Sequence, residues 1–177
     1  EELYDLKDDP HEINNLASDP AYADKLKKLR EVHMQWVRET RDLGLVPEPE
    51  IELREKAAGS RYEILSKTDD HTLSSRLGEV AAKASDGPEA LPDLITALAD
   101  KDPAVRYWAA TGVGNIGKDA RHVSGKILKI LKNDSSTVVR VAAARALLRM
   151  NVDEPAALVE LEKALQSPEQ WSRLHAA

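Results

Sequence analysis

DPAVRYWAATGVGNIG, residues 102–117, is the stretch that decides the fold, because its pattern returns further along the chain. A shift of 34 residues superposes six of its positions on residues of the same or similar type: Val105 on Val139, Arg106 on Arg140, Ala109 on Ala143, Ala110 on Ala144, Val113 on Leu147 and Ile116 on Met150. A shift of 33 then places Arg140 on Arg173. Self-similarity at such a period is typical of repeat proteins. We therefore expect residues 61–177 to form a repeat array whose last copy is cut at the end of the chain.

Each copy is predicted to contain two helices. Apolar residues recur at spacings of three and four, as on one face of a helix. In the first helices of the copies they are Leu91, Leu94, Ile95 and Leu98, then Val123, Ile127, Ile130 and Leu131, then Leu158, Leu161 and Leu165. Asp102 followed by Pro103 marks the start of a second helix, because the aspartate caps an amide and proline lacks only a donor that would be unpaired there. Residues 167–170 (SPEQ) resemble a capping box at another such start.

The residues Asp102, Val105 and Arg106 resemble the D-x-x-V-R core of the HEAT and HEAT-like family. The second copy departs from this pattern, since Asp134 lies two positions further from its Val-Arg pair. The resemblance implies an all-α fold, a short α-solenoid of helix pairs in which stacking supplies the core. An amphipathic helix around residues 73–84 matches the repeat poorly, as expected of a terminal unit. Such an array is a scaffold rather than a catalyst.

The composition excludes several classes of site. The 177 residues include no Cys, which excludes a disulfide framework, a thiolate zinc site and a cysteine nucleophile. No run of about 18 apolar residues occurs, so we expect no membrane-spanning segment. The histidines are scattered without paired metal-ligand spacing, so we expect no metal site; they are His11, His33, His71, His122 and His175.

The first part of the chain predicts a strand, a turn and a long helix. Residues 2–6 (ELYDL) favour a short strand, and residues 8–10 (DDP) favour a turn. The helix begins at Asp19, a capping residue with proline behind it, and ends near Gly44. His33 is expected to be half-buried on the apolar face of this helix.

Three segments follow from these patterns. Residues 1–45 are the strand, turn and helix, and residues 61–177 are the repeat array. Pro47 and Pro49 cannot continue a helix, so residues 46–60 are predicted to be an extended linker.

The string ELYDLKDDPHEINNLASDP, residues 2–20, resembles the C-terminal tail of type I sulfatases. The tail has a strand E-L-Y-D-L followed by D-P-x-E-x-x-N-L-A and a final helix. The matching residues are Glu2, Leu3, Tyr4, Asp5, Leu6, Asp9, Pro10, Glu12, Asn15, Leu16 and Ala17. The match covers about the first 45 residues, and it implies the end of a small subdomain that packs on a catalytic domain.

The same resemblance implies that catalysis belongs to a parent polypeptide. Type I sulfatases hydrolyse sulfate esters with a formylglycine, made from Cys or Ser in C/S-x-P-x-R, beside a calcium ion. Residues 18–22 (SDPAY) are the nearest string, and they end in Tyr rather than Arg. We therefore predict no catalytic, cofactor-binding or metal-binding residue in this chain. If the parent is a typical bacterial sulfatase, its location is periplasmic or extracellular.

Gly112, Gly114 and Gly117 fit G-x-G-x-x-G, the phosphate-binding pattern of dinucleotide-binding folds. That loop must follow a buried strand, whereas this string lies at the end of a predicted helix. We therefore expect these glycines to serve helix packing and termination.

The partner we expect is a protein: the parent's own catalytic domain, another subunit or a second copy of this chain. The candidate contact surface comprises Arg106, Tyr107, Trp108, Arg140 and Trp171. A core role is the default expectation for Trp108 and Trp171, and exposure of Tyr107 or Trp108 would instead indicate a binding surface. A free-standing interaction scaffold is the alternative function. Nucleic-acid binding is a further alternative, through the basic residues Arg106, Lys118, Arg121, Lys126, Lys129, Lys132, Arg140, Arg145 and Arg149. The net charge of −6 argues against it.

Overall fold

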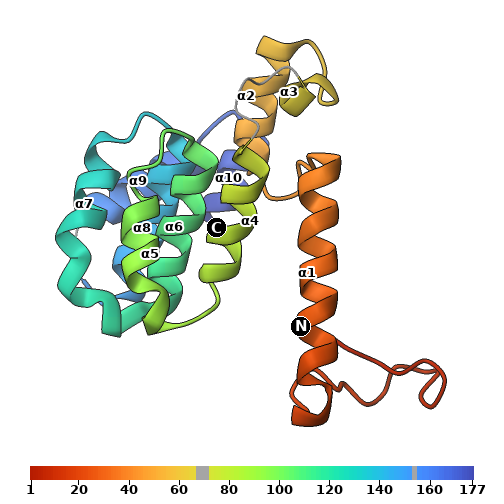
Figure 1. The fold of residues 1–177 in the computed structure, drawn as a ribbon. Helices are drawn as coiled ribbons and strands as arrows, with labels where there is room; N and C mark the ends of the chain where they lie inside the picture. Colours follow the sequence, from red (N-terminus) through yellow and green to blue (C-terminus); the bar gives the residue numbers. More distant parts are fainter. Residues whose placement is uncertain (67–71, 153–154) are drawn as a thin grey trace. The chain divides into compact units, whose positions relative to one another are not determined.

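The chain divides into two units, Glu1–Thr40 and Arg41–Ala177, in the computed structural model, which describes residues 1–66, 72–152 and 155–177. The described residues are helical and include no strand, so the predicted all-α class is confirmed (Figure 1).

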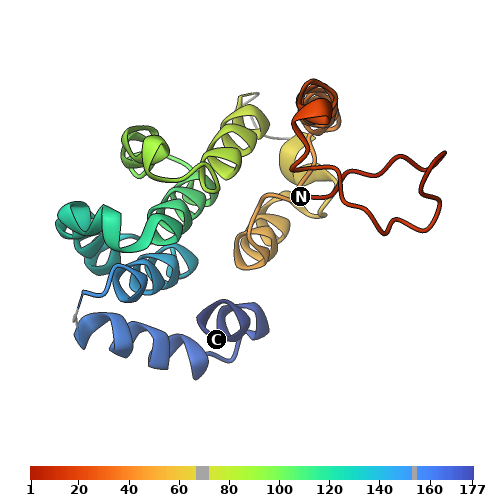
Figure 2. The same ribbon diagram turned by 90° about the horizontal axis from the view of Figure 1, so that it is seen from below.

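In the second unit, seven helices alternate between two layers. The inner layer comprises α4 (Leu73–Lys83), α6 (Pro103–Ile116), α8 (Thr137–Arg149) and α10 (Gln170–Ala176). The outer layer comprises α5 (Leu91–Ala97), α7 (Ser124–Asn133) and α9 (Pro155–Leu165). Two 3-10 helices, η2 (Pro88–Ala90) and η3 (Gly117–Val123), lead into α5 and α7. The helices from α4 to α10 follow one another along an arc (Figure 2), which is the predicted HEAT-like solenoid of helix pairs.

Small residues let the inner helices pack closely. Ala109 and Ala110 of α6 are fully buried, as are Ala143 and Ala144 of α8. These alanine pairs lie at equivalent positions of the two repeats, so the period seen in the sequence is the period of the core.

Gly112 and Gly114 of α6 serve packing, and Gly117 terminates the helix, as predicted. A Cβ atom on Gly112 would lie 2.9 Å from Cα of Ala84, the residue that follows α4. A Cβ atom on Gly114 would lie 3.0 Å from Cα of Ala146 in α8. Gly117 ends α6 with φ 67°, a left-handed conformation that favours glycine.

The first unit consists of a loop, the 3-10 helix η1 (Pro20–Tyr22) and α1 (Ala23–Thr40). The predicted helix start is confirmed, because Asp19 accepts the amide of Ala21 at 2.9 Å. The predicted strand at residues 2–6 is wrong. A strand needs a partner strand, and here the backbone instead bonds to Asn15, whose Oδ1 accepts the amide of Leu3 at 3.1 Å.

Helix α1 differs from the prediction at its end and on its face. It ends at Thr40 rather than near Gly44, because Arg41 adopts φ 51° and leaves the helical path. His33 is exposed rather than half-buried, and its ring stacks on Trp36 with centroids 6.3 Å apart.

The predicted linker at residues 46–60 is wrong, because most of it forms α2 (Glu48–Ala58), which is followed by α3 (Glu63–Ser66). Pro47 occupies the N-cap position of α2, and Pro49 lies in the first turn of the helix. A residue in the first turn has no helical acceptor for its amide, so the missing amide proton of proline costs nothing there. Glu48 and Glu50 in the same turn interact favourably with the helix dipole. The prolines therefore begin a helix here.

Candidate functional site

Arg106 in the first turn of α6 links two successive repeats. Its Nε and Nη2 donate to the two carboxylate oxygens of Asp134 at 2.7 and 2.9 Å. The two side chains are 13% and 4% exposed. Hydrogen bonding to Asp134 raises the pKa of Arg106, so the guanidinium stays charged. Breaking such a buried pair by removing one partner typically costs about 3–5 kcal/mol, because the other charge is left unpaired.

The arginine of each repeat also closes the turn before its own helix. Its Nη1 donates to the carbonyls six and five residues earlier: Asp100 and Lys101 for Arg106, Asp134 and Ser135 for Arg140, Ser167 and Pro168 for Arg173. The repeated arginine therefore satisfies carbonyls that the turn would leave without helical partners.

Two further arginines pair forward to the next turn or helix, as Arg106 does. Nε of Arg140 lies 2.8 Å from a carboxylate oxygen of Glu160. Nε of Arg76 in α4 lies 2.9 Å from a carboxylate oxygen of Asp100. Helix α4 thus carries the repeat arginine at a spacing of 30 rather than 34, which is why the sequence comparison missed it.

The turns ahead of α6, α8 and α10 share one geometry. In each turn a side-chain oxygen accepts a hydrogen bond from the backbone amide two residues later. The acceptors are Asp100, Asp134 and Ser167, and the donors are the amides of Asp102, Ser136 and Glu169, at 2.8, 2.9 and 3.2 Å. Asp134 is therefore the equivalent of Asp100 rather than of Asp102. This explains the two-residue departure from D-x-x-V-R in the second copy.

The predicted capping box at residues 167–170 is wrong in its details. Ser167 is used in the turn, and Glu169 caps α10 by accepting the amides of Trp171 and Ser172 at 2.7 and 2.5 Å. Burial raises the pKa of Glu169, but hydrogen bonds from Ser172 and Trp171 outweigh it, and the net pKa is lowered. The ionised carboxylate is therefore the capping form.

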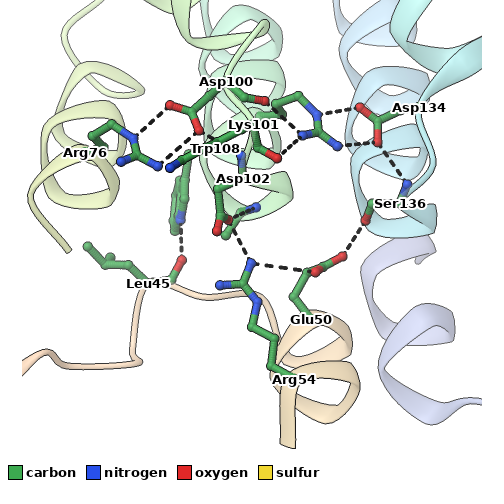
Figure 3. A network of polar contacts seen from close by, with 12 residues as sticks. Leu45, Glu50, Arg54, Arg76, Asp100, Lys101, Asp102, Trp108, Asp134 and Ser136 are labelled. Carbon is green, nitrogen blue, oxygen red and sulfur yellow. Dashed lines mark hydrogen bonds and ion pairs between the residues drawn. The ribbon is translucent and has the colours of Figure 1, made fainter. Parts of the chain in front are cut away.

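Helix α2 is held against the N-terminal ends of α6 and α8 by polar contacts (Figure 3). Nη2 of Arg54 lies 2.7 Å from Oδ1 of Asp102, the residue that caps α6. Oε1 of Glu50 accepts the hydroxyl of Ser136, the residue before α8, at 2.6 Å. Glu50 is buried, and Arg54 also lies 3.7 Å from it. The inner layer thus already binds one helix within this chain.

Aromatic side chains extend this contact. Trp108 donates through Nε1 to the carbonyl of Leu45 at 2.7 Å. The ring of Tyr107 meets the rings of Trp108 and His175 edge-on, with centroids 5.5 Å apart in both cases. Burial raises the pKa of the Tyr107 hydroxyl. Nε2 of His175 lies 3.1 Å from a carboxylate oxygen of Glu48 in α2.

The structure distributes the predicted contact residues over two roles. Tyr107 and Trp108 lie together, half-buried, near α2 and the segment before it. Arg106 and Arg140 bind the turns and link repeats. Trp171 is half-buried in the first turn of α10. As a surface for another protein, the set stays a prediction.

Sequence reasoning missed the residues around a cavity of about 120 Å³ in the inner layer, beside Tyr107. Arg145 and Arg149 of α8 line it, together with His175 of α10. In the sequence the two arginines were members of a long basic series. Their spacing of four, which places both on one helix face, was the signal that could have singled them out.

The described residues do not fit the formylglycine and calcium that a sulfatase uses. Within residues 1–66, 72–152 and 155–177, no group of three or more His, Asp or Glu side chains converges on a metal position. Asp19 of the SDPAY string caps a helix. His71 lies outside the described residues. No helix in the described part has the length and apolar character needed to cross a bilayer.

Comparison with known proteins finds both a HEAT repeat and a similarity to sulfatases, each over a limited part of the chain. A family model described as HEAT repeat matches residues 90–120, which include α5 and α6. The chain is 43% identical over 51 residues to the "Ulvan-active sulfatase" of Formosa agariphila, covering 29% of this chain and 9% of that protein. It is 51% identical over 41 residues to "N-sulphoglucosamine sulphohydrolase" of Homo sapiens, covering 23% of this chain and 8% of that protein. No solved structure matches the chain.

The chain spans less than a tenth of the length of these two relatives. The matched HEAT repeat coincides with the helix pair whose arginine links successive turns. The chain is thus an array of helix pairs that matches a HEAT repeat model over residues 90–120 and is similar to sulfatases over a short stretch.

Proposed function

We propose that this chain is the non-catalytic C-terminal region of a sulfatase-like hydrolase, with the HEAT-like array as a scaffold for protein contact. The parent would hydrolyse sulfate esters with residues outside this chain. The two sulfatase matches, over 51 and 41 residues, are similar in length to the first 45 residues on which the resemblance rests. They support the sulfatase half of the proposal.

The structure of the first unit also supports the relationship to sulfatases. Asn15, one of the matching residues, bridges the loop, because its side chain bonds to the backbone of Glu1, Leu3 and Ala17. The motif therefore has a structural role that explains its fixed spacing.

Helix α1 exposes an apolar face. Leu29, Val32 and Trp36 lie on one side of the helix and are 47%, 55% and 53% exposed. Large exposed apolar residues mark contact sites. In our proposal this face packs on the catalytic domain of the parent.

The observation that carries the scaffold half is the binding of α2 to the inner layer. Helices in repeat arrays present an extended concave surface to their partners. Here that surface receives a helix through Asp102, Ser136 and His175. Nucleic acid is less well supported, because Arg106 and Arg140 of the basic series are ion-paired with acidic residues of the chain.

The gene itself tests the sulfatase half. We expect the reading frame upstream of Glu1 to encode a C/S-x-P-x-R motif. An upstream frame without this motif would contradict the proposal and leave the free-standing scaffold as the function.

Turnover tests the non-catalytic assignment. The full-length polypeptide should hydrolyse 4-nitrophenyl sulfate, and removal of the whole second unit, residues 41–177, should leave its kcat unchanged. This chain alone should show no turnover. Activity of the chain alone that survives repurification, or loss of kcat in the truncated enzyme that folds normally, would contradict the assignment.

A further inference from the structure

The inner layer contains a cavity beside the helix that it already binds. Its walls are Tyr107 and Thr111 of α6, Arg145 and Arg149 of α8, and His175 of α10. Gly114, Ala142 and Ala146 also line it, and the close approach of α6 to α8 at Gly114 makes this floor of small residues. Longer side chains therefore surround a shallow floor.

The cavity is basic, because its two arginines are not neutralised by carboxylates in the described part of the chain. Arg145 donates through Nη1 to the carbonyl of His175 at 2.9 Å. Arg149 donates through Nη1 to Oδ1 of Asn115 at 2.5 Å. Both arginines are exposed, and no acidic residue lines the cavity. They differ in this from Arg106 and Arg140, whose charges are paired.

A carboxylate already lies close to this cavity. Glu48 of α2 approaches Nε2 of His175 at 3.1 Å, and Nδ1 of the same ring lies 3.4 Å from the hydroxyl of Tyr107. Helix α2 thus shows, within the chain, the chemistry that this part of the inner layer accepts: a helix that presents glutamates.

The spacing of the arginines defines the ligand further. Arg145 and Arg149 are one turn apart on α8, which corresponds to a rise of about 6 Å along the helix. Acidic residues at positions i and i+4 of a partner helix have the same spacing. A nucleic-acid duplex is a poorer match, because the chain carries a net charge of −6 and would repel it.

We propose that the cavity formed by Tyr107, Arg145, Arg149 and His175 binds an acidic helix of a partner protein through two carboxylates four residues apart. The inference rests on the scaffold role proposed above and adds the site and the chemistry of the partner.

The test measures the fluorescence anisotropy of a labelled helical 15-residue peptide with Glu at positions i and i+4. This peptide should bind the chain in about 50 mM NaCl, where the Debye length is above about 10 Å, and be released in about 500 mM NaCl, where the Debye length falls well below about 10 Å and exposed charge pairs are screened. A peptide with Gln at both positions should bind at least about tenfold more weakly.

Variants locate the site. The double variant Arg145→Glu/Arg149→Glu should lose at least about tenfold in affinity for the Glu peptide. The control Arg121→Glu/Lys132→Glu changes the net charge equally at exposed positions of η3 and α7, and it should bind as the wild type does. Circular dichroism and the urea midpoint should be unchanged in both. If the Glu variant unfolds, Arg145→Gln/Arg149→Gln replaces it.

Equal binding by the cavity variant and the wild type would overturn the proposal, as would equal binding of the Glu and Gln peptides. A labelled DNA duplex that binds more tightly than the peptide through the same arginines would also overturn it. Peptide binding does not depend on the sulfatase assay. Failure here with kcat retained in the truncated enzyme therefore rejects this inference alone, and the converse result rejects only the proposed function.

Discussion

An arginine recurs at the same position of successive repeats because it binds backbone carbonyls of the turn before its helix. The helices α6, α8 and α10 each follow a turn whose last carbonyls have no helical partner, and one guanidinium reaches two of these carbonyls. The arginine has five donors, so the same side chain also pairs with a carboxylate further along, as Arg106 does with Asp134. A lysine could not replace it, because its ammonium group cannot make this planar, forked contact.

Two glycines with different surroundings give a prediction at this scale. Gly114→Ala should destabilise the chain by about 1–3 kcal/mol, because its Cβ would lie 3.0 Å from the backbone of Ala146 and force α6 and α8 apart. Gly125→Ala is the matched control. Nothing lies within 4 Å of its Cβ, so it should stabilise α7 by up to about 1 kcal/mol.

Urea unfolding at neutral pH measures both variants. A Gly114→Ala protein as stable as the wild type would show that the two inner helices separate at no cost, and it would contradict the packing described here.

Among the elements, α2 is the helix that packs against the inner layer through polar contacts. Its apolar contribution is limited, since its buried residues are Pro49 and Glu50. It is attached through charged and hydrogen-bonded side chains, whose contributions are individually small when exposed and larger when buried. The attachment of α2 therefore depends on a few contacts.

A double-mutant cycle on Arg54 and Asp102 tests this attachment. Their side chains are 20% and 14% exposed, so we expect a coupling of about 1 kcal/mol in urea unfolding. Asp102→Ala alone should also lower the free energy of unfolding by about 1 kcal/mol, because Asp102 caps α6 by accepting the amide of Ala104 and this bond is lost. The cycle removes this contribution.

The ion pair between Arg61 and Glu55 is the control for that cycle. It also involves α2, but its side chains are 60% and 39% exposed, so its coupling should stay below about 0.5 kcal/mol. Equal couplings for the two pairs would mean that α2 is not held by the inner layer.

At the scale of the molecule, the two units differ in how much they bury. In α6 and α8, seven and eight residues are buried, and one apolar cluster extends through the array from Val46 to Ala157. In α1, only Leu26 and Val37 are buried among its 18 residues. Local stability follows buried apolar contacts, so the units should open with different free energies.

Hydrogen exchange followed by mass spectrometry measures this difference. Amides of α6 and α8 should exchange most slowly, those of α9 at an intermediate rate, and those of α1 fastest. Helix α9 buries two residues, Ala157 and Ala164, and serves as the internal comparison. Protection of α1 equal to that of α8 would contradict the prediction.

Much of the array could be predicted from the sequence. The apolar spacings and the Asp102 cap are local features that report on contacts within one or two turns of a helix, and their return after 34 residues shows that the same helix pair is repeated. The strand at residues 2–6 and the linker at residues 46–60 were predicted wrongly. A strand depends on a partner elsewhere, and prolines suit the first turn of a helix as well as they suit an extended chain.

The candidate site was predictable only in part. Tyr107 and Trp108 were named from the sequence, whereas Arg145, Arg149 and His175 were not singled out as a group. They meet only when three repeats stack, and Ser136 meets Glu50 across 86 residues of chain.

The sequence by itself determined the helix pairs and their repetition, because caps, prolines and apolar periodicity act over a few residues. Only the tertiary structure decided which arginines are paired with carboxylates and which are bonded to uncharged oxygens. Arg106 and Arg149 both belong to the basic series of the sequence, but the stacking of the repeats brings Asp134 to the first and Asn115 to the second. Ion pairing depends on atoms a few ångströms apart in space, and no local pattern encodes that distance.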